Sequence, residues 1–459
     1  MFDTTIAAIA TAVGPSGVGK VRISGPDSFV IISKIAFTGK KEPLFDTNME
    51  GHTIHHGYIY DGDVVIDEVL ILLMRAPKTY TGEDTVEIDC HGGVMVMQKI
   101  LETVLKNGGL LAEPGEFSKR AFLNGKMDLT KAESVIDLIN SSNKFAMDNS
   151  LKHLTGRLSG KIADLRKELL HEIAYIEAAL DDPEHYDLTG YDDELKGKLS
   201  VIKAQTSELI DSFDNGRILK EGINVAIVGE PNVGKSTLLN AITGFDTAIV
   251  TDIAGTTRDI ITEHVMFGNI SLNIMDTAGI RQTDDPIELI GVNRSLKAIE
   301  DSDLVLFMVD GTTPINDYED EIYNLVKNKQ VIMILNKVDR VTVVTPEEYK
   351  ERYDLPVISV SAKNNEGIEL LQKEISDMFF NGEVTFNNEV YVTSVRQKNC
   401  LIEADKAIEN VLNSIENHMP EDFFSIDIMA AYAALGRMIG EEVGDDLVNE
   451  IFSKFCMGK

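Results

Sequence analysis

The stretch Gly229-Glu-Pro-Asn-Val-Gly-Lys-Ser236 decides the fold of the part of the chain that surrounds it. It follows the apolar run Ile223 to Val228 and precedes Thr237-Leu-Leu-Asn-Ala-Ile-Thr243, so the local order is strand, glycine loop, helix. Glycines let backbone N–H groups close around an anion, and the N-terminus of the helix faces that anion. Lys235 can neutralise the terminal phosphates and Ser236 can ligate Mg2+, so the expected ligand is a nucleoside triphosphate.

A second stretch, Gly14-Pro-Ser-Gly-Val-Gly-Lys20, has the same glycine and lysine spacing but a different context. Position 21 is Val rather than Ser or Thr, and the run from Val21 to Ser24 alternates as a strand does. Neither the magnesium hydroxyl nor the helix N-terminus is therefore supplied. We predict an ordinary turn at this place.

Length and composition limit the class of protein. With 459 residues the chain is expected to form two to four domains, and no apolar run approaches the length of a membrane span. Cys90, Cys400 and Cys456 are scattered without a CxxC pair, so reduced thiols and a cytoplasmic location are expected. The net charge of -32 argues against broad, nonspecific binding of nucleic acid, so any contact with nucleic acid must be local or made through a partner.

The chain divides by its residue pattern into four segments. Residues 1–118 mix short alternating runs with Gly, Pro and Asp turns, which is typical of an α+β domain. Residues 119–216 and 381–459 have apolar residues recurring at three and four positions, which predicts a helical domain. Residues 217–380 alternate strands with helices, which predicts an α/β domain with a mostly parallel sheet. Because helical segments flank it, we expect the α/β domain to be inserted into the helical domain.

Further motifs follow strand-like runs of the α/β segment, at the sheet edge where ligands bind. Asp276-Thr-Ala-Gly279 offers a carboxylate to the magnesium shell through water and its last N–H to the γ-phosphate. Asn336-Lys-Val-Asp339 offers its last carboxylate to the N1–H and 2-amino group of guanine, and Ser361-Ala-Lys363 supports the base. Adenine cannot offer that pair of donors, so the site is expected to reject ATP.

The stretch Gly255-Thr-Thr-Arg-Asp259 lies between the phosphate loop and Asp276, in the place of the first switch of a GTPase. Thr257 is therefore the candidate for the second magnesium hydroxyl. Together, the phosphate loop, the switch stretch and the three later motifs resemble the GTPase family, with a Ras-like parallel sheet.

The residue that would activate water is not settled by these motifs. Ras-like GTPases place a water-orienting Gln directly after the Asp-x-x-Gly glycine, and this chain has Ile280 there. Gln282 lies nearby, Glu288 could orient water, and Arg281 and Arg258 could supply charge. From the residues alone, each is better explained as a surface group of a switch than as a catalyst.

Motifs beyond the GTPase set carry a closer resemblance. They are Ile249 to Asp259, Thr81-Gly-Glu-Asp84, Pro114-Gly-Glu-Phe-Ser-Lys-Arg-Ala-Phe-Leu-Asn124 and the terminal Phe455-Cys-Met-Gly-Lys459. With the phosphate loop, they make the whole chain similar to the family of tRNA uridine-modification GTPases called MnmE or TrmE. Met457, where the family usually has Ile, is a mild departure.

The resemblance implies a potassium-stimulated GTPase of tRNA modification. It implies a homodimer that acts with an FAD-binding partner protein to place an aminomethyl or carboxymethylaminomethyl group on C5 of the wobble uridine (U34) of certain tRNAs. The one-carbon donor would be a 5-formyl or methylene form of tetrahydrofolate, bound in the N-terminal domain, where the homodimer would also form. The chain has no convincing dinucleotide fingerprint, in agreement with a flavin held by the partner.

The resemblance also assigns residues of the nucleotide site. K+ would be bound by Asn232, with help from Thr251, Ile253 and Thr256, and Glu288 becomes the favoured water-orienting base. Mg2+ would be bound by Ser236 and Thr257. The GTP-binding residues would be Asn232, Val233, Gly234, Lys235, Ser236, Thr237, Thr251, Thr256, Thr257, Asp276, Thr277, Ala278, Gly279, Asn336, Lys337, Asp339, Ser361, Ala362 and Lys363.

The folate site implied by the resemblance consists of Arg22, Glu87 and Lys126, joined by Lys459 from the far end of the chain. A pterin needs a carboxylate for its paired N–H donors and the folate tail needs cations, so these residue types suit the ligand. Cys456 is either a thiolate that takes part in the modification chemistry or a small apolar residue that fills a gap.

Two other classes of protein remain as alternatives. A ribosome-assembly or RNA-binding GTPase shares this type of phosphate loop but usually carries a basic RNA-binding module, which the acidic C-terminal segment does not provide. A dynamin-like membrane GTPase needs a basic amphipathic or lipid-anchored segment, and we find none in the sequence.

Overall fold

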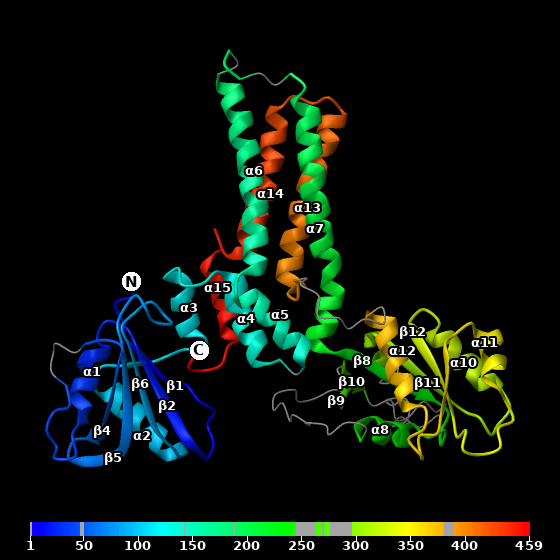
Figure 1. Cartoon of the computed structure of the whole chain (residues 1–459), viewed down its shortest axis with the longest axis horizontal. Helices are drawn as coiled ribbons and strands as arrows, with labels where there is room; N and C mark the ends of the chain where they lie inside the picture. Colours follow the sequence, from blue (N-terminus) through cyan, green and yellow to red (C-terminus); the bar gives the residue numbers. More distant parts are fainter. Residues whose placement is uncertain are drawn as a thin grey trace. The chain divides into compact units, whose positions relative to one another are not determined.

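A computed structural model describes residues 2–45, 50–141, 143–182, 184–186, 189–244, 262–268, 270–275, 296–380 and 390–459. The chain forms two compact units, each built from separated stretches of sequence. Figure 1 labels the helices and strands that make them up. The first unit comprises Met1–Ile136, Lys152–Leu199 and Lys406–Lys459, and the second comprises Asp137–Leu151 and Ser200–Asp405.

The first unit contains a mixed sheet whose strands are ordered β3-β4-β5-β6-β2-β1-β7. Neighbouring strands pair antiparallel, except that β1 and β7 pair in parallel. Two helices, α1 (Ser28–Ile35) and α2 (Val94–Lys106), pack on one face of this sheet. The strands are β1 (Ile6–Ile9), β2 (Ser16–Ser24), β3 (Ala36–Phe37), β4 (Thr53–Asp61), β5 (Val64–Met74), β6 (Thr85–Gly92) and β7 (Leu110–Leu111).

Side chains alternate between the two faces of β2 and β6. Val21 and Ile23 of β2, and Ile88 of β6, point into the core beneath α1 and α2. Residues between them therefore point to the opposite face, where Arg22 and Glu87 are register partners. The predicted α+β domain is confirmed. In the stretch from Gly14 to Lys20, however, residues 16–20 already belong to strand β2, so the prediction of a turn is wrong for most of it, and the chain continues as a strand and not as a helix.

Helices complete the first unit. Within it, α6 packs along α14, and Arg166 of α6 forms a salt bridge with Glu441. A separate apolar cluster joins Leu129 to Phe452 and Phe455 near the end of the chain. No helix of the described ranges is long and apolar enough to cross a membrane. The helices that lie wholly or partly in this unit are α3 (Glu116–Leu123), α4 (Leu129–Ile139), α5 (Lys144–Leu154), α6 (Arg157–Asp181), α7 (Tyr191–Glu221), α13 (Val395–Glu416), α14 (Asp422–Ile439) and α15 (Asp445–Ser453).

The second unit contains a sheet with strand order β13-β12-β11-β8-β10-β9. The strands pair in parallel, except for β9, which forms an antiparallel pair with β10. The mostly parallel sheet is thus confirmed, while β9 was not predicted. The strands are β8 (Ile223–Gly229), β9 (Thr262–Phe267), β10 (Ile270–Met275), β11 (Leu304–Asp310), β12 (Gln330–Asn336) and β13 (Val357–Val360).

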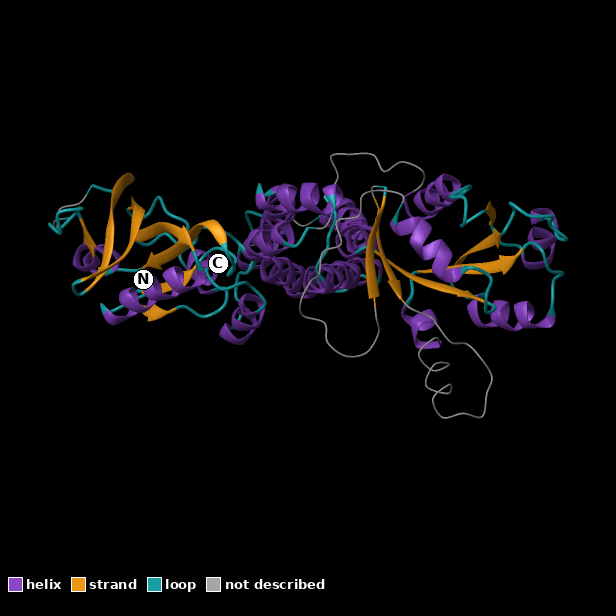
Figure 2. Cartoon of the chain, turned by 90° about the horizontal axis from the view of Figure 1, so that it is seen from below, coloured by secondary structure: helices purple, strands orange, loops and turns teal. Residues whose placement is uncertain are grey.

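Helices cover both faces of this parallel sheet (Figure 2). The helices α8 (Lys235–Thr243) and α12 (Ile368–Phe380) pack on one face, and α10 (Asp317–Val326) and α11 (Pro346–Tyr353) pack on the other. Since both faces are covered, the central strands are apolar throughout, as in β11 and β12. Asp310 and Asn336 are the last residues of these two strands, and the carboxyl ends of the strands form the candidate site.

Candidate functional site

The phosphate-loop sequence forms the predicted strand, loop and helix, because β8 ends at Gly229 and α8 begins at Lys235. Gly229 and Gly234 have backbone φ angles of 148° and 109°, which side-chain-bearing residues rarely adopt. A Cβ atom at Gly229 would lie 2.2 Å from the carbonyl oxygen of Met308, and one at Gly234 would lie 2.5 Å from Nδ2 of Asn336. Both positions therefore require glycine.

Side chains of the protein hold the carbonyl oxygens of this loop. The Lys235 ammonium donates to the carbonyls of Gly229 and Glu230, at 2.7 and 2.9 Å. Asn336 Nδ2 donates to the Val233 carbonyl at 2.7 Å. A loop whose carbonyls are fixed in this way can direct its N–H groups toward a phosphate.

Lys235 is the cation that a terminal phosphate would meet. Burial lowers the pKa of its ammonium, although the neighbouring Glu230 carboxylate opposes this effect. Ser236 and Thr237 follow it in the first turn of α8, and both are exposed. An exposed hydroxyl beside a lysine at a helix N-terminus is a donor set that suits a magnesium-bound phosphate.

The guanine motif lies at the same edge of the sheet. Asn336 is the last residue of β12 and is buried, and its Oδ1 accepts a hydrogen bond from Ala362 N at 3.0 Å. The hydroxyl of Ser361 donates to Oδ1 of Asp339 at 2.9 Å and so orients the carboxylate. Lys363 is exposed next to these residues. The structure thus brings the phosphate loop, the Asn-Lys-x-Asp motif and the Ser-Ala-Lys motif together.

The other predicted residues of the nucleotide site lie outside the described residues. They are Thr251, Ile253, Thr256, Thr257, Asp276, Thr277, Ala278, Gly279 and Glu288. Their roles in binding Mg2+ or K+ and in activating water therefore stay predictions.

Asp310, which ends β11, belongs to this edge of the sheet but was not predicted. Its Oδ2 forms a salt bridge with the Lys337 ammonium, at a distance of 2.5 Å. The available signal was positional, because Asp310 is the polar residue at the carboxyl end of an apolar strand, the edge of a parallel sheet where ligands bind.

A second group of predicted residues meets in the first unit. Arg22 Nε donates to Glu87 Oε1 at 2.8 Å across the β2–β6 pair, and Arg22 Nη1 donates to the Gly458 carbonyl at 3.0 Å. The Lys459 ammonium lies 5.8 Å from the centre of the Tyr80 ring, and the Arg22 guanidinium lies 5.5 Å from the same ring. Three of the four predicted folate residues therefore share one surface with Tyr80.

The charged groups of this surface shift one another's pKa values. Burial lowers the pKa of Lys459, and the Arg22 charge lowers it further. Burial alone would raise the pKa of Glu87, but its bonds to Lys20 and Arg22 outweigh burial and lower it. Glu87 consequently stays ionised between two cations.

Lys20 and Tyr80 belong to this surface but were not predicted. The Lys20 ammonium contacts Glu87 Oε2 and lies 3.1 Å from Asp89 Oδ1. Lys20 is two residues before Arg22 on β2, so the alternation of the strand would have placed it on the same face. The fourth predicted folate residue, Lys126, instead donates to the Pro77 carbonyl at 2.9 Å, on the loop that carries Tyr80.

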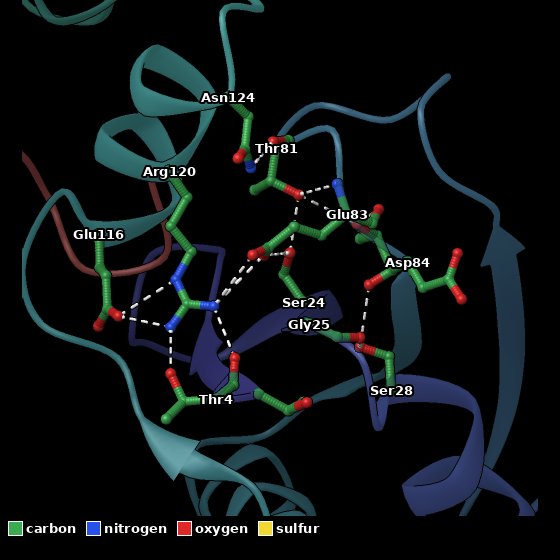
Figure 3. A network of polar contacts seen from close by, with 12 residues as sticks. Thr4, Ser24, Gly25, Ser28, Thr81, Glu83, Asp84, Glu116, Arg120 and Asn124 are labelled. Carbon is green, nitrogen blue, oxygen red and sulfur yellow. Dashed lines mark hydrogen bonds and ion pairs between the residues drawn. The ribbon is translucent and has the colours of Figure 1, made fainter. Parts of the chain in front are cut away.

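A buried polar network holds that loop (Figure 3). The Arg120 side chain is 1% exposed and donates to Glu83, to Glu116 and to the backbone and hydroxyl of Thr4. The hydroxyl of Ser24, at the end of β2, donates to Glu83 Oε2 at 2.8 Å. The Thr81-Gly-Glu-Asp84 and Pro114–Asn124 motifs thus join the loop and α3 to β2.

The Cys456 thiol is exposed, whereas the preceding Phe455 is buried. The interpretation of Cys456 as a residue that fills an apolar gap is therefore wrong, because Phe455 occupies the apolar cluster instead. Gly458 has a φ of 83°, and a Cβ atom there would lie 2.5 Å from the Ile9 carbonyl oxygen. This close approach fixes the terminal motif against β1.

Two protein-family models match the chain. The model described as the GTP-binding protein TrmE N-terminus matches residues 5–126, and the model described as the MnmE helical domain matches residues 129–456.

Curated proteins match over the full length. A protein of Lachnoclostridium phytofermentans named tRNA modification GTPase MnmE is 50% identical and covers 100% of both chains. A protein of the same name from Acetivibrio thermocellus is 44% identical and covers 100% of this chain and 99% of its own. The solved structure of a point variant of Aquifex aeolicus Era bound to GDP·AlF4- covers 40% of this chain and 65% of its own, at 31% identity and a TM-score of 0.29.

Proposed function

The chain belongs to the MnmE family of tRNA modification GTPases, and on this basis we propose that it binds and hydrolyses GTP in the course of tRNA modification. The observation that carries the proposal is full-length identity of 50% and 44% to proteins of that name. Two sets of contacts support it. Asn336 bonds both Val233 of the phosphate loop and Ala362, and Ser361 orients the Asp339 carboxylate, an arrangement that suits a guanine nucleotide.

Four described residues of the nucleotide site have a direct role in this proposal. Asp339 accepts the N1–H and 2-amino protons of guanine, and Ser361 keeps its carboxylate in place. Lys235 offsets the phosphate charge, and Ser236 ligates Mg2+. Mg2+ would neutralise charge on the phosphate oxygens. Thr257 and Asp276 are proposed to complete the magnesium shell.

We further propose that K+ stimulates hydrolysis through Asn232, with Thr251, Ile253 and Thr256 as the other ligands. The exposed amide of Asn232 and its left-handed backbone, with φ of 65°, support a side chain presented by a fixed loop. Positive charge at this point offsets charge that shifts toward the β–γ bridging oxygen. Glu288 is proposed as the base that orients water.

For the one-carbon donor we propose the surface of Arg22, Glu87 and Lys459, with Lys126 at its border. Cations predominate over carboxylates there, which suits the anionic tail of a tetrahydrofolate derivative. Both oxygens of Glu87 already accept bonds from Lys20 and Arg22, so pterin N–H groups would use the remaining lone pairs. The exposed Cys456 thiol near this surface is the proposed reagent of the modification chemistry.

The assembly is proposed from the family resemblance. The chain would form a homodimer, act with an FAD-binding partner protein, and modify C5 of the wobble uridine of certain tRNAs in the cytoplasm. The net charge of -32 favours tRNA contacts that are local or made by the partner. Domain boundaries near residues 118, 216 and 380 are part of the same proposal.

Profiling the modified nucleosides of tRNA in cells that lack the protein tests this function. We expect the aminomethyl or carboxymethylaminomethyl uridine to disappear from the wobble position and to return when the gene is restored. Unchanged wobble uridine together with accumulated ribosomal precursors would favour the alternative, a ribosome-assembly GTPase, and would contradict the proposal.

A further inference from the structure

Asp310 ends the strand that lies between the phosphate loop and the guanine motif. In the parallel sheet, β11 pairs with β8 so that Met308 is opposite Gly229, and with β12 so that Asp310 is opposite Asn336. The end of β11 therefore lies between the strand that leads into the phosphate loop and the strand that leads into the guanine motif.

One ammonium group connects the two motifs at this point. Lys337 Nζ donates to the Asn232 carbonyl in the phosphate loop at 3.0 Å and to Asp310 Oδ2 at 2.5 Å. The Lys337 side chain is 24% exposed and the Asp310 side chain 13%, so water competes only partly for these bonds.

The other oxygen of Asp310 is already engaged. Thr312 donates to Asp310 Oδ1 twice, from its backbone N at 3.0 Å and from its hydroxyl at 2.7 Å. These bonds fix the carboxylate plane and leave Oδ2 directed at Lys337. Burial alone would raise the pKa of Asp310, but Lys337 and Thr312 outweigh it and lower the pKa, so the carboxylate is ionised at neutral pH.

The backbone on both sides of this bridge is in a conformation that needs support. Asn232 has a φ of 65° and Lys337 a φ of 67°, and neither is glycine. Left-handed conformations of such residues persist where surrounding contacts hold them. The bonds from Lys337 to Asn232 and Asp310 are contacts of that kind.

We propose that Asp310 is a positioning residue of the GTP site: it holds the Lys337 ammonium on the Asn232 carbonyl and thereby fixes the guanine motif against the phosphate loop. This inference rests on the proposed GTP function and adds a residue to it. Asp310 need not touch the nucleotide, because it acts through Lys337.

If Asp310 served only to hold the turn at Thr312, the effect of replacing it by Asn would be different. The turn at Thr312 needs only an acceptor at Oδ1, which the amide oxygen of Asn also supplies. The bridge needs an acceptor at Oδ2, where Asn places an NH2 group that cannot accept from Lys337. Asp310→Asn therefore keeps the turn and removes the bridge.

The test uses the full-length protein and a fluorescent GDP analogue, with affinity and dissociation rate measured for the wild type, Asp310→Asn, Lys337→Met and the double variant. We expect Asp310→Asn to weaken binding and speed release by roughly three- to ten-fold, and to have no further effect once Lys337 is Met. The matched control is Asp320→Asn, which breaks the exposed pair of Asp320 with Arg352 and should bind as the wild type does. Thermal melting of each variant shows whether it is folded.

Two results would overturn the inference while leaving the proposed function intact. They are wild-type nucleotide binding by Asp310→Asn, and full additivity of its effect with that of Lys337→Met. If Asp310→Asn does not fold, Thr312→Val replaces it, because this change loosens the Asp310 carboxylate but keeps its charge. The effect of Thr312→Val on nucleotide binding must then be non-additive with that of Lys337→Met. A wild-type protein that binds no guanine nucleotide would instead refute the proposed function itself.

Discussion

The side-chain amide of Asn336 donates a hydrogen bond from Nδ2 to the carbonyl oxygen of Val233, at 2.7 Å and across 103 positions of sequence. The same amide accepts a hydrogen bond from Ala362 N at 3.0 Å. One buried side chain thus joins the phosphate loop, the guanine motif and the Ser-Ala-Lys motif, which follow three different strands.

Replacing Asn336 by Ala is expected to loosen all three motifs at once. The buried Val233 carbonyl and Ala362 N–H would lose their partner, which costs about 1–3 kcal/mol of unfolding free energy per group. We expect lower stability in chemical denaturation and weaker GTP binding by titration. Asn364→Ala, which removes an exposed amide of the loop after β13, is the control, and equal behaviour of the two variants would contradict the prediction.

Changing Asp339 to Asn is expected to switch the base preference. An amide NH2 would face the N1–H and 2-amino group of guanine, so GTP affinity should fall by roughly a hundred-fold. Xanthine offers a carbonyl in place of the amino group, and XTP should bind more tightly to the variant than GTP does. The measurement is competition between the two nucleotides, and a retained preference for GTP would show that the guanine assignment is wrong.

The cation dependence of turnover tests the proposed role of Asn232. With K+ replaced by Na+ at equal ionic strength, GTP turnover by the wild type should fall by about ten-fold. Asn232→Ala should turn over GTP slowly in both salts while still binding it. Equal wild-type rates in the two salts would refute a K+ site in this loop.

Calorimetry with a tetrahydrofolate derivative on the full-length protein tests the surface formed by Arg22, Glu87 and Lys459 in the first unit. Arg22→Ala and Lys459→Ala should each reduce affinity by roughly ten-fold, because each removes a charge-assisted hydrogen bond. Lys106→Ala removes a cation that is paired with Asp61 on an exposed part of the same domain and should leave binding unchanged. Equal losses in all three variants would argue against a specific site.

Stability of the second unit should depend on pH through Glu319. This carboxyl is 2% exposed and accepts the Tyr349 hydroxyl, and burial raises its pKa to about 7. A raised pKa means that the folded state binds the proton more tightly than the unfolded state. The associated stability is fully present below about pH 4.5, the ordinary pKa, and is lost as pH rises through 7.

The loss amounts to at most about 3 kcal/mol of unfolding free energy. Glu319→Gln should therefore be more stable than the wild type at pH 8 and gain almost nothing at pH 4, in denaturant titrations at the two pH values. Glu321→Gln, an exposed neighbour on α10, is the control. Parallel curves for the wild type and Glu319→Gln would show that the buried carboxyl does not titrate in this range.

The parts of the fold that the sequence predicted are those that depend on local spacing. The order of apolar run, glycine loop and Lys235 fixes strand β8 and helix α8 within about twenty residues, and the guanine motif follows β12 directly. Ser361 and Ala362 were likewise found because they follow β13.

Residues whose roles depend on neighbouring strands could not be found in this way. Asp310 matters because β11 lies between β8 and β12, and no single segment of sequence specifies the strand order. Strand alternation places Lys20 on the same face of β2 as Arg22, but its contact with Glu87 depends on the β2–β6 register, which no single segment of sequence specifies. Arg120 resembles a surface charge in isolation, and it becomes buried because Glu83, Glu116 and Thr4 converge on it.

The central claim, that GTP hydrolysis by this chain serves tRNA modification, is tested most directly by complementation. Cells lacking the protein would receive either the wild type or Lys235→Ala, and the wobble-uridine nucleosides of their tRNA would be quantified by mass spectrometry. We predict full restoration of the modified uridine by the wild type and none by Lys235→Ala at equal protein level. Full restoration by Lys235→Ala would contradict the account.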